Sequence, residues 1–306
     1  MNAKKIASCS GDAISSLPDE ILDLILSLLP IRLAASTSIL SKIWKNLFPL
    51  MIASQHHVKF YESDFLYPNE ANKSNGQQNF RAFVDSTLSR NRNPIKKFTL
   101  KCQDDVDHFK AHTNQWIKNA LERGVSDLNL RFTMPLINKL EKLRKCLLPD
   151  IFFTSKTLVK LTLGTGICVG CNPNIDFCLP VLKSLFLYTV WFVEIDFSDF
   201  VIRQCPVLEE LYIQHSYIKH QWWEGHNLIC HPNVKRIKIH YDYPISKRKK
   251  MAFNTPNLVY LDYFDRLSNV EYYWANFMDS LVEARLDLVL QYECRPYEYE
   301  NHFLDL

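Results

Sequence analysis

Glycine is scarce in this chain. Only seven of its 306 residues are glycine, which disfavours the glycine-rich loops that cradle nucleotide phosphates. No GxSxG, P-loop or HExxH pattern occurs, so no local signature of a hydrolase, a nucleotide site or a zinc peptidase is present. Neither sign of charge dominates: the net charge is +3, which disfavours a dedicated binder of nucleic acid or membrane surfaces. An enzyme whose site is assembled from residues distant in sequence stays an alternative.

The sequence also lacks a long uninterrupted apolar run. Its densest apolar stretch, Ile21–Leu33, is broken by Asp23, Pro30 and Arg32 and is too short to span a bilayer. The first residues, MNAKKIASCSGD, contain no apolar core of a signal peptide, so we expect none. The nine cysteines form an odd, scattered set, which fits reduced thiols in the nucleus or cytoplasm better than a disulfide framework.

Metal ligands are sparse as well. Cys168 and Cys171 stand in a CVGC run and Cys178 follows, but no second spaced pair lies nearby, and a structural zinc site needs four ligands. We therefore expect no metal and no cofactor. The basic run 247–250 (KRKK) is either a solvated loop or a nuclear-import signal.

The N-terminal segment has the pattern of a compact helical unit. Leu17-Pro18-Asp19-Glu20 predicts a helix start, because proline is tolerated in the first turn and acidic side chains there favour the helix dipole. Apolar residues then recur at helical spacing until Pro30, which ends the helix. A second helix is expected at about residues 33–40, and Ser41 could cap a third. From periodicity alone, a small bundle packed on the following domain is an open alternative.

Residues 12–48, DAISSLPDEILDLILSLLPIRLAASTSILSKIWKNLF, resemble the plant F-box, a helical module that docks onto a Skp-type adaptor of a cullin ubiquitin ligase. The pattern LPDEIL…IL…LP…A…TS.LSK.W..L is matched in register. It departs at Ile43, where the family usually has arginine, and at Phe48, where tryptophan is common. The resemblance implies these adaptor-facing residues: Leu17, Pro18, Ile21, Ile25, Leu28, Pro30 and Trp44.

The rest of the chain carries an irregular repeat with the core Leu-x-x-Leu-x-Leu. Its central residues, at 161, 185, 211, 237 and 261, are separated by 24, 26, 26 and 24 residues, which is the spacing of leucine-rich repeats. Weaker, more widely spaced units stand around Phe98 and Leu128, and one follows around Ala284. Prolines at 180, 206, 232 and 256 set the approach to the strands. Segments such as Ser198–Cys205 are expected to form short outer helices. An ordinary α/β domain with buried strands is the alternative.

The phrases CPVLEELYI, TPNLVYLDY and LVEARLDL resemble the repeats of plant F-box proteins of the FBD type. That family often ends with a small FBD domain, and this chain stops at Leu306 soon after the last repeat, so it is expected to be either a short member without that domain or a truncated gene product. We therefore predict an α/β chain with an N-terminal three-helix F-box and an irregular leucine-rich-repeat solenoid with a parallel sheet. The expected divisions are 12–50 (F-box), 51–94 (linker and capping segment), 95–290 (repeats) and 291–306 (tail).

Within the linker, Tyr67–Gln78 is polar and predicts a loop, whereas Asn79–Ser89 places its apolar residues on one helical face and predicts a helix that caps the solenoid.

Alternation of period two predicts that the leucines point into the core and the residues between them form the solenoid's inner face. This inner face is rich in aromatic and basic residues, the types enriched at binding hot spots. We expect it to bind a target protein through Phe186, Tyr188, Tyr212, Arg236, Lys238, Tyr260 and Phe264. The alternative is that these rings pack beneath loops.

Together the two resemblances imply the non-catalytic substrate-recognition subunit of an SCF-type ubiquitin ligase. Its expected partners are a Skp-type adaptor, a cullin reached through that adaptor, and a protein target, with neither nucleic acid nor membrane. A plant protein of the nucleus or cytoplasm is implied. The alternative is an interaction scaffold, or a decayed F-box protein, that binds the adaptor without delivering a target.

Overall fold

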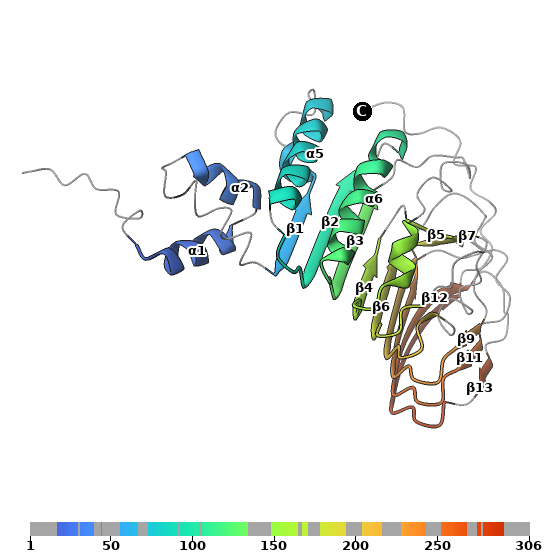
Figure 1. The fold of residues 1–306 in the computed structure, drawn as a ribbon. Helices are drawn as coiled ribbons and strands as arrows, with labels where there is room; N and C mark the ends of the chain where they lie inside the picture. The colour runs from blue at the N-terminus through green and yellow to red at the C-terminus, as the bar shows by residue number, and fades with distance from the viewer. Residues whose placement is uncertain are drawn as a thin grey trace, which may run out of the picture.

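The chain folds into a small helical unit followed by a long curved sheet (Figure 1). This computed structural model describes most of the helices and strands but not every connection. The residues described are 17–29, 31–39, 44, 56–66, 73–90, 92–103, 106–133, 148–164, 167–170, 178–193, 204–215, 228–242, 252–267, 274–276 and 278–290.

The helical unit begins with α1 (Asp19–Leu28), continues with α2 (Ile31–Ser36) and tightens into the 3-10 turn η1 (Thr37–Ile39). The carbonyl of Pro18 accepts hydrogen bonds from the backbone N–H groups of Ile21 and Leu22, at 3.0 and 3.1 Å. This bonding, with two acidic residues in the first turn, confirms the predicted helix start. Of the predicted third helix the structure describes only Trp44, which is helical; Pro30 lies outside the described residues.

Nine described strands form one parallel sheet in the order β1-β2-β3-β4-β6-β8-β10-β12-β14. Each pairs with its neighbours in the parallel direction, as a solenoid of stacked repeats requires. Their bounds are β1 (His57–Tyr61), β2 (Lys97–Gln103), β3 (Asp127–Thr133), β4 (Lys160–Leu163), β6 (Ser184–Tyr188), β8 (Glu210–His215), β10 (Arg236–Tyr241), β12 (Tyr260–Leu267) and β14 (Glu283–Leu290).

The repeat pattern is confirmed residue by residue. The predicted central residues Leu161, Leu185, Leu211, Ile237 and Leu261 pair across adjacent strands in one unbroken row. All five are buried in a single core that runs from β1 to β12. The residues between them are less buried in β6, β8, β10 and β12, which confirms the predicted alternation there, whereas in β4 Thr162 is buried like its neighbours.

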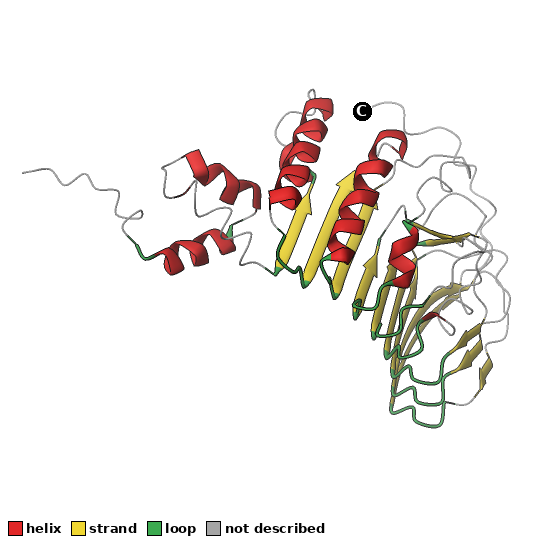
Figure 2. Ribbon diagram, in the orientation of Figure 1, coloured by secondary structure: helices red, strands yellow, loops and turns green. Residues whose placement is uncertain are grey.

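The outer layer changes along the solenoid. Helices α4 (Ser63–Leu66), α5 (Lys73–Arg90), α6 (Val106–Glu122) and the 3-10 helix η4 (Asp150–Thr154) lie over one face of the first strands (Figure 2). In later repeats the described outer elements are short strands instead. They are β5 (Cys168–Gly170) with β7 (Trp191–Val193), and β9 (Leu228–Cys230), β11 (Ala252–Asn254) and β13 (Trp274–Asn276).

The short outer helices expected between the later strands stay a prediction, because most of those connections lie outside the described residues. Of Ser198–Cys205 the structure describes only the last two positions, and Gln204 is helical.

The sheet begins earlier than the repeat pattern predicts. Strand β1, inside the segment assigned to linker and cap, pairs with β2 and buries Val58 and Phe60. Helix α5 connects these two parallel strands, so it is the outer helix of a first repeat rather than a cap alone. The predicted helix Asn79–Ser89 is confirmed within it, with Phe80, Val84 and Leu88 buried.

The loop predicted over Tyr67–Gln78 is partly wrong, because Lys73–Gln78 forms the first turns of α5. Gly76 allows this arrangement. A Cβ atom at Gly76 would stand 2.9 Å from the carbonyl oxygen of Phe65, so a larger residue would push α4 away from α5. Residues 67–72 lie outside the described residues.

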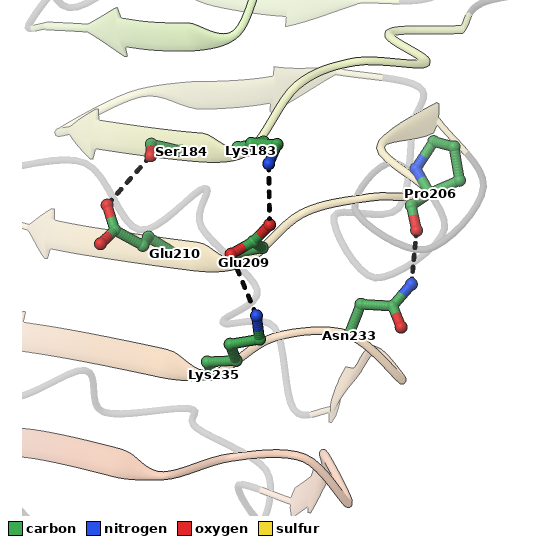
Figure 3. A network of polar contacts seen from close by, with 7 residues as sticks. All are labelled: Lys183, Ser184, Pro206, Glu209, Glu210, Asn233 and Lys235. Carbon is green, nitrogen blue, oxygen red and sulfur yellow. Dashed lines mark hydrogen bonds and ion pairs between the residues drawn. The ribbon is translucent and has the colours of Figure 1, made fainter.

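The turns that precede successive strands are linked to one another (Figure 3). The predicted prolines lie in these turns, and the side-chain amides of Asn233 and Asn257 donate to the carbonyls of Pro206 and Pro232, both at 2.8 Å. These bonds satisfy carbonyl groups that the turns leave unpaired.

Three successive repeats are also joined by charge. Glu209 accepts ion pairs from Lys183 and Lys235, at 3.2 Å each, which lowers the pKa of its carboxyl group (Figure 3). The contacts are exposed and each contributes little stability, but they mark a repeated position on one edge of the solenoid.

Candidate functional site

Helix α1 carries an apolar stripe that faces solvent. Ile21, Leu24 and Leu28 follow one another at intervals of three and four residues, which places them on one side of the helix, and Leu17 precedes the helix four residues before Ile21. Their exposed fractions are 37%, 44%, 56% and 78%. Contiguous exposed apolar side chains of this kind are typical of a surface that another protein covers. We call these four residues the α1 stripe.

The opposite side of α1 packs into a core of its own. Leu22, Leu26, Ala34 and Trp44 are buried together, and Ile25 and Leu29 pack against them. Trp44 is only 4% exposed, so in this structure it supports the helical unit from inside and does not lie on an exposed face.

The predicted adaptor-facing residues thus divide between exposed and buried positions. Leu17, Ile21 and Leu28 are on the stripe, Pro18 is exposed at its N-terminal end, and Ile25 is half-buried. Sequence reasoning missed Leu24, although the spacing of the stripe was a usable signal. It also missed Leu33 and Ile39, which are 53% and 85% exposed.

The helical unit contacts the first repeat through Arg32 and Phe65. The guanidinium carbon of Arg32 on α2 lies 5.0 Å from the centre of the Phe65 ring on α4. Phe65 in turn packs on Phe80 and Phe83 of α5, with ring centres 5.5 and 5.3 Å away. Burial raises the pKa of the neighbouring Asp64 carboxyl, and the charge of Arg32 partly offsets that rise. A cation–π contact therefore ties the helical unit to the core of the solenoid.

The inner face holds a cluster of aromatic rings at its centre. The ring of Tyr212 on β8 lies 5.9 Å from Phe186 and 5.2 Å from Tyr188, both on β6. Its hydroxyl donates to Oε1 of Gln214 at 3.0 Å. Burial is the main cause that raises the pKa of the Tyr212 phenol, so the ring stays neutral and holds its hydrogen bond at physiological pH.

Two cations stack on this cluster from the N-terminal side. The guanidinium of Arg131 on β3 lies 4.3 Å from the Tyr188 ring, and the ammonium of Lys160 on β4 lies 4.9 Å from Phe186. Gly164 makes the first contact possible, since a Cβ atom there would stand 2.7 Å from Cγ of Arg131. Arg131 was missed because its repeat departs from the leucine pattern, although it lies in the inner-face register of β3.

The C-terminal side of the inner face combines aromatic rings with ion pairs. Lys238 bonds Asp262 at 2.8 Å, and this bond is the main cause that raises the pKa of Lys238. Tyr260 lies between two guanidinium groups, with Arg236 at 4.8 Å and Arg285 at 5.9 Å. The Phe264 ring lies 4.5 Å from His240.

The structure therefore brings all seven predicted target-binding residues to one face. Those residues, on β6, β8, β10 and β12, are partly exposed or exposed, and the described loops do not bury them.

No three His, Cys, Asp or Glu side chains of the described residues gather where they could hold a metal ion. Burial raises the pKa of the Cys205 thiol to about 12, which leaves it inert. Of the CVGC run, Cys171 lies outside the described residues. None of the described helices is long and apolar enough to cross a membrane.

Comparison with known proteins identifies both parts of the chain. A family model described as "F-box domain" matches residues 14–50, and one described as "FBD-associated F-box protein At5g56370, LRR repeats" matches residues 113–267. No solved structure matches the chain.

The relatives are Arabidopsis thaliana proteins. The F-box/LRR-repeat protein At5g25860 is 39% identical over 100% of this chain and 68% of its own length. The F-box/LRR-repeat protein At3g60040 is 39% identical over 95% of this chain and 64% of its own length. The F-box protein At4g27050 is 40% identical over 95% of this chain and 61% of its own length. The chain thus spans about two thirds of the length of these relatives, and it belongs to the FBD-associated F-box/leucine-rich-repeat family.

Proposed function

We propose that the protein is the substrate-recognition subunit of an SCF-type ubiquitin ligase. The observation that carries the proposal is the exposed α1 stripe, which lies within the F-box match in a chain whose repeats present a second, chemically different surface. An apolar stripe fits a stable protein interface, and an aromatic and charged face fits selective recognition.

In this role the chain performs no chemistry itself. The α1 stripe docks on a Skp-type adaptor, which connects to a cullin. The inner face holds the target through its aromatic cluster and the Arg236–Tyr260 pair. The Arg32–Phe65 contact limits the freedom between the two surfaces, so that a target lysine is held near the charged ubiquitin-conjugating enzyme. The rate gain is one of proximity and orientation.

The site of action that we propose is the nucleus or the cytoplasm. The described cysteines Cys102, Cys178, Cys205 and Cys230 are free thiols, which fits a reducing compartment.

Adaptor binding is the first test. Replacing Leu24 with glutamate puts a charge in the middle of the stripe, and we expect affinity for a Skp-type adaptor to fall by about 2–4 kcal/mol, the range of a central interface anchor. The matched control is Val181→Glu, because Val181 is 37% exposed on the solenoid, away from the F-box. Equal adaptor binding by both variants, measured by isothermal titration calorimetry, would show that the stripe is not the docking surface.

Target delivery is tested separately. Depleting the protein is expected to stabilise its target, and restoring wild-type chain, but not the Leu24→Glu variant, is expected to shorten the target's half-life again. Adaptor and cullin binding without any stabilised protein would instead identify a scaffold or a decayed family member.

A further inference from the structure

The inner face divides into two halves of different charge. Its N-terminal half, on β1 to β4, presents five cations, and Asp127 is the acidic inner-face residue that the described strands place among them. Asp127 pairs with Lys97 at 2.8 Å. The other four cations have no acidic partner among the described residues. They are Lys59, Lys101, Arg131 and Lys160.

The C-terminal half has no net charge. Strands β8 to β14 place four cations, Arg236, Lys238, Arg266 and Arg285, beside four acidic residues, Glu210, Asp262, Glu283 and Asp287, on the same face. Two of the cations are held in ion pairs, Lys238 with Asp262 at 2.8 Å and Arg285 with Glu283 at 2.9 Å. Excess positive charge is therefore confined to the N-terminal half.

The basic half is built in three rows across the strands. In the first row Lys97, Asp127 and Lys160 are paired neighbours, and in the third row Lys101 lies beside Arg131. Between them runs a row of short polar residues, Thr99, Asn129 and Thr162. Thr99 and Thr162 are buried. The long cationic side chains of the first and third rows therefore stand on either side of a middle row of short polar side chains.

The same row leads into the aromatic cluster. Thr162 pairs with Phe186 in the next strand, and Phe186 pairs with Tyr212. A segment lying along this row would meet cations first and aromatic rings afterwards.

We propose that the N-terminal half of the inner face binds an extended acidic segment of the target, whose carboxylates or phosphates meet Lys101, Arg131 and Lys160 and whose next apolar side chain packs on Phe186 and Tyr212. The proposal rests on the proposed function, because the segment belongs to the protein delivered for ubiquitylation. Strands lie about 4.8 Å apart, so the three steps from β2 to β6 cover about 14 Å, which an extended chain spans in about four residues.

The charge pattern favours a short acidic polypeptide over a nucleic acid. A phosphate backbone that continued along the face would meet Glu210, Asp262, Glu283 and Asp287, which repel it. A segment with a few anions followed by an apolar residue matches both halves.

Fluorescence anisotropy with the full chain tests the proposal. The probe is a labelled peptide with a run of glutamates followed, about four residues later, by phenylalanine. Its companions replace the glutamates by glutamines or by phosphoserines, or the phenylalanine by serine. We expect the glutamine and serine peptides to bind at least about tenfold more weakly at low salt. Tighter binding of the phosphoserine or of the glutamate peptide supports the proposal and identifies the preferred anion.

Variants locate the site. Lys101→Gln with Lys160→Gln is expected to weaken binding about tenfold, whereas Lys118→Gln with Lys156→Gln, which removes the same charge outside the inner face, changes it less than about twofold. Equal weakening by both pairs, or equal affinity for the glutamate and glutamine peptides, overturns the proposal. So does a thymidine oligonucleotide that binds more tightly than either acidic peptide. Adaptor binding measured on the same variants separates this failure from failure of the proposed function.

Discussion

Trp44 and Leu28 both belong to the residues that the F-box resemblance implies for adaptor binding, yet the structure gives them opposite roles. Trp44 is 4% exposed in the core of the helical unit, whereas Leu28 is 78% exposed on the α1 stripe. Trp44→Ala should therefore remove about 3–5 kcal/mol of stability from that unit, as for a buried aromatic residue. Leu28 buries about a fifth of its side chain, so Leu28→Ala should cost only about 0.4 kcal/mol of the roughly 2 kcal/mol that full burial provides.

Hydrogen exchange of the α1 amides in the full chain measures these two costs locally. We expect Trp44→Ala to accelerate exchange by more than about a hundredfold, with Trp44→Phe recovering most of the protection, and Leu28→Ala to change it less than about threefold. Both alanine variants should bind the adaptor more weakly, Trp44→Ala because its docking unit opens and Leu28→Ala because a contact is lost. Loss of adaptor binding by Trp44→Ala with normal protection of α1 would refute this division.

Three further outcomes follow from the solenoid. Ile239→Ala, at a fully buried position, should lower the unfolding free energy by about 2–4 kcal/mol, whereas Leu286→Ala, 62% exposed on the last described strand, should lower it by less than about 1 kcal/mol; urea unfolding measures both. Burial lowers the pKa of His231 below its ordinary value of about 6.5, so the unfolded chain binds a proton that the folded chain does not. The unfolding free energy should therefore fall as the pH drops below about 6.5, and His231→Gln should remove that part of the slope. Iodoacetamide should label exposed Cys178 in the native protein and leave buried Cys205 unlabelled until denaturation, as mass spectrometry of peptides would reveal.

The strands and core positions of the repeats were predictable, because the same sequence pattern occurs in each repeat. The leucines of the repeat core reappear at nearly constant spacing, and stacking brings them into one row. The repeat pattern does not predict strand β1, because its sequence HVKFY has no leucine and is followed by the long segment that forms α4 and α5.

The individual contacts of the candidate sites could not be derived in the same way. Arg131 stacks on Tyr188 because Gly164, directly after the intervening strand β4, has no side chain to block the contact, and no local sequence pattern predicts that proximity. Trp44 and Leu28 are both apolar residues of one short motif, and which of them faces inward depends on how α1 and α2 pack. Burial, rather than residue type, separates the core of the helical unit from the exposed α1 stripe.

The most direct test of the two-surface account measures both partners on the same set of variants. Quantitative pull-down from plant cells would compare wild-type chain with Leu24→Glu and with Tyr212→Ala plus Arg236→Glu, recording the adaptor and the proteins that accumulate when the chain is depleted. We predict that Leu24→Glu loses the adaptor and keeps those proteins, and that the inner-face variant keeps the adaptor and loses them. Loss of both partners by either folded variant, or target capture unchanged by Tyr212→Ala plus Arg236→Glu, would contradict the account.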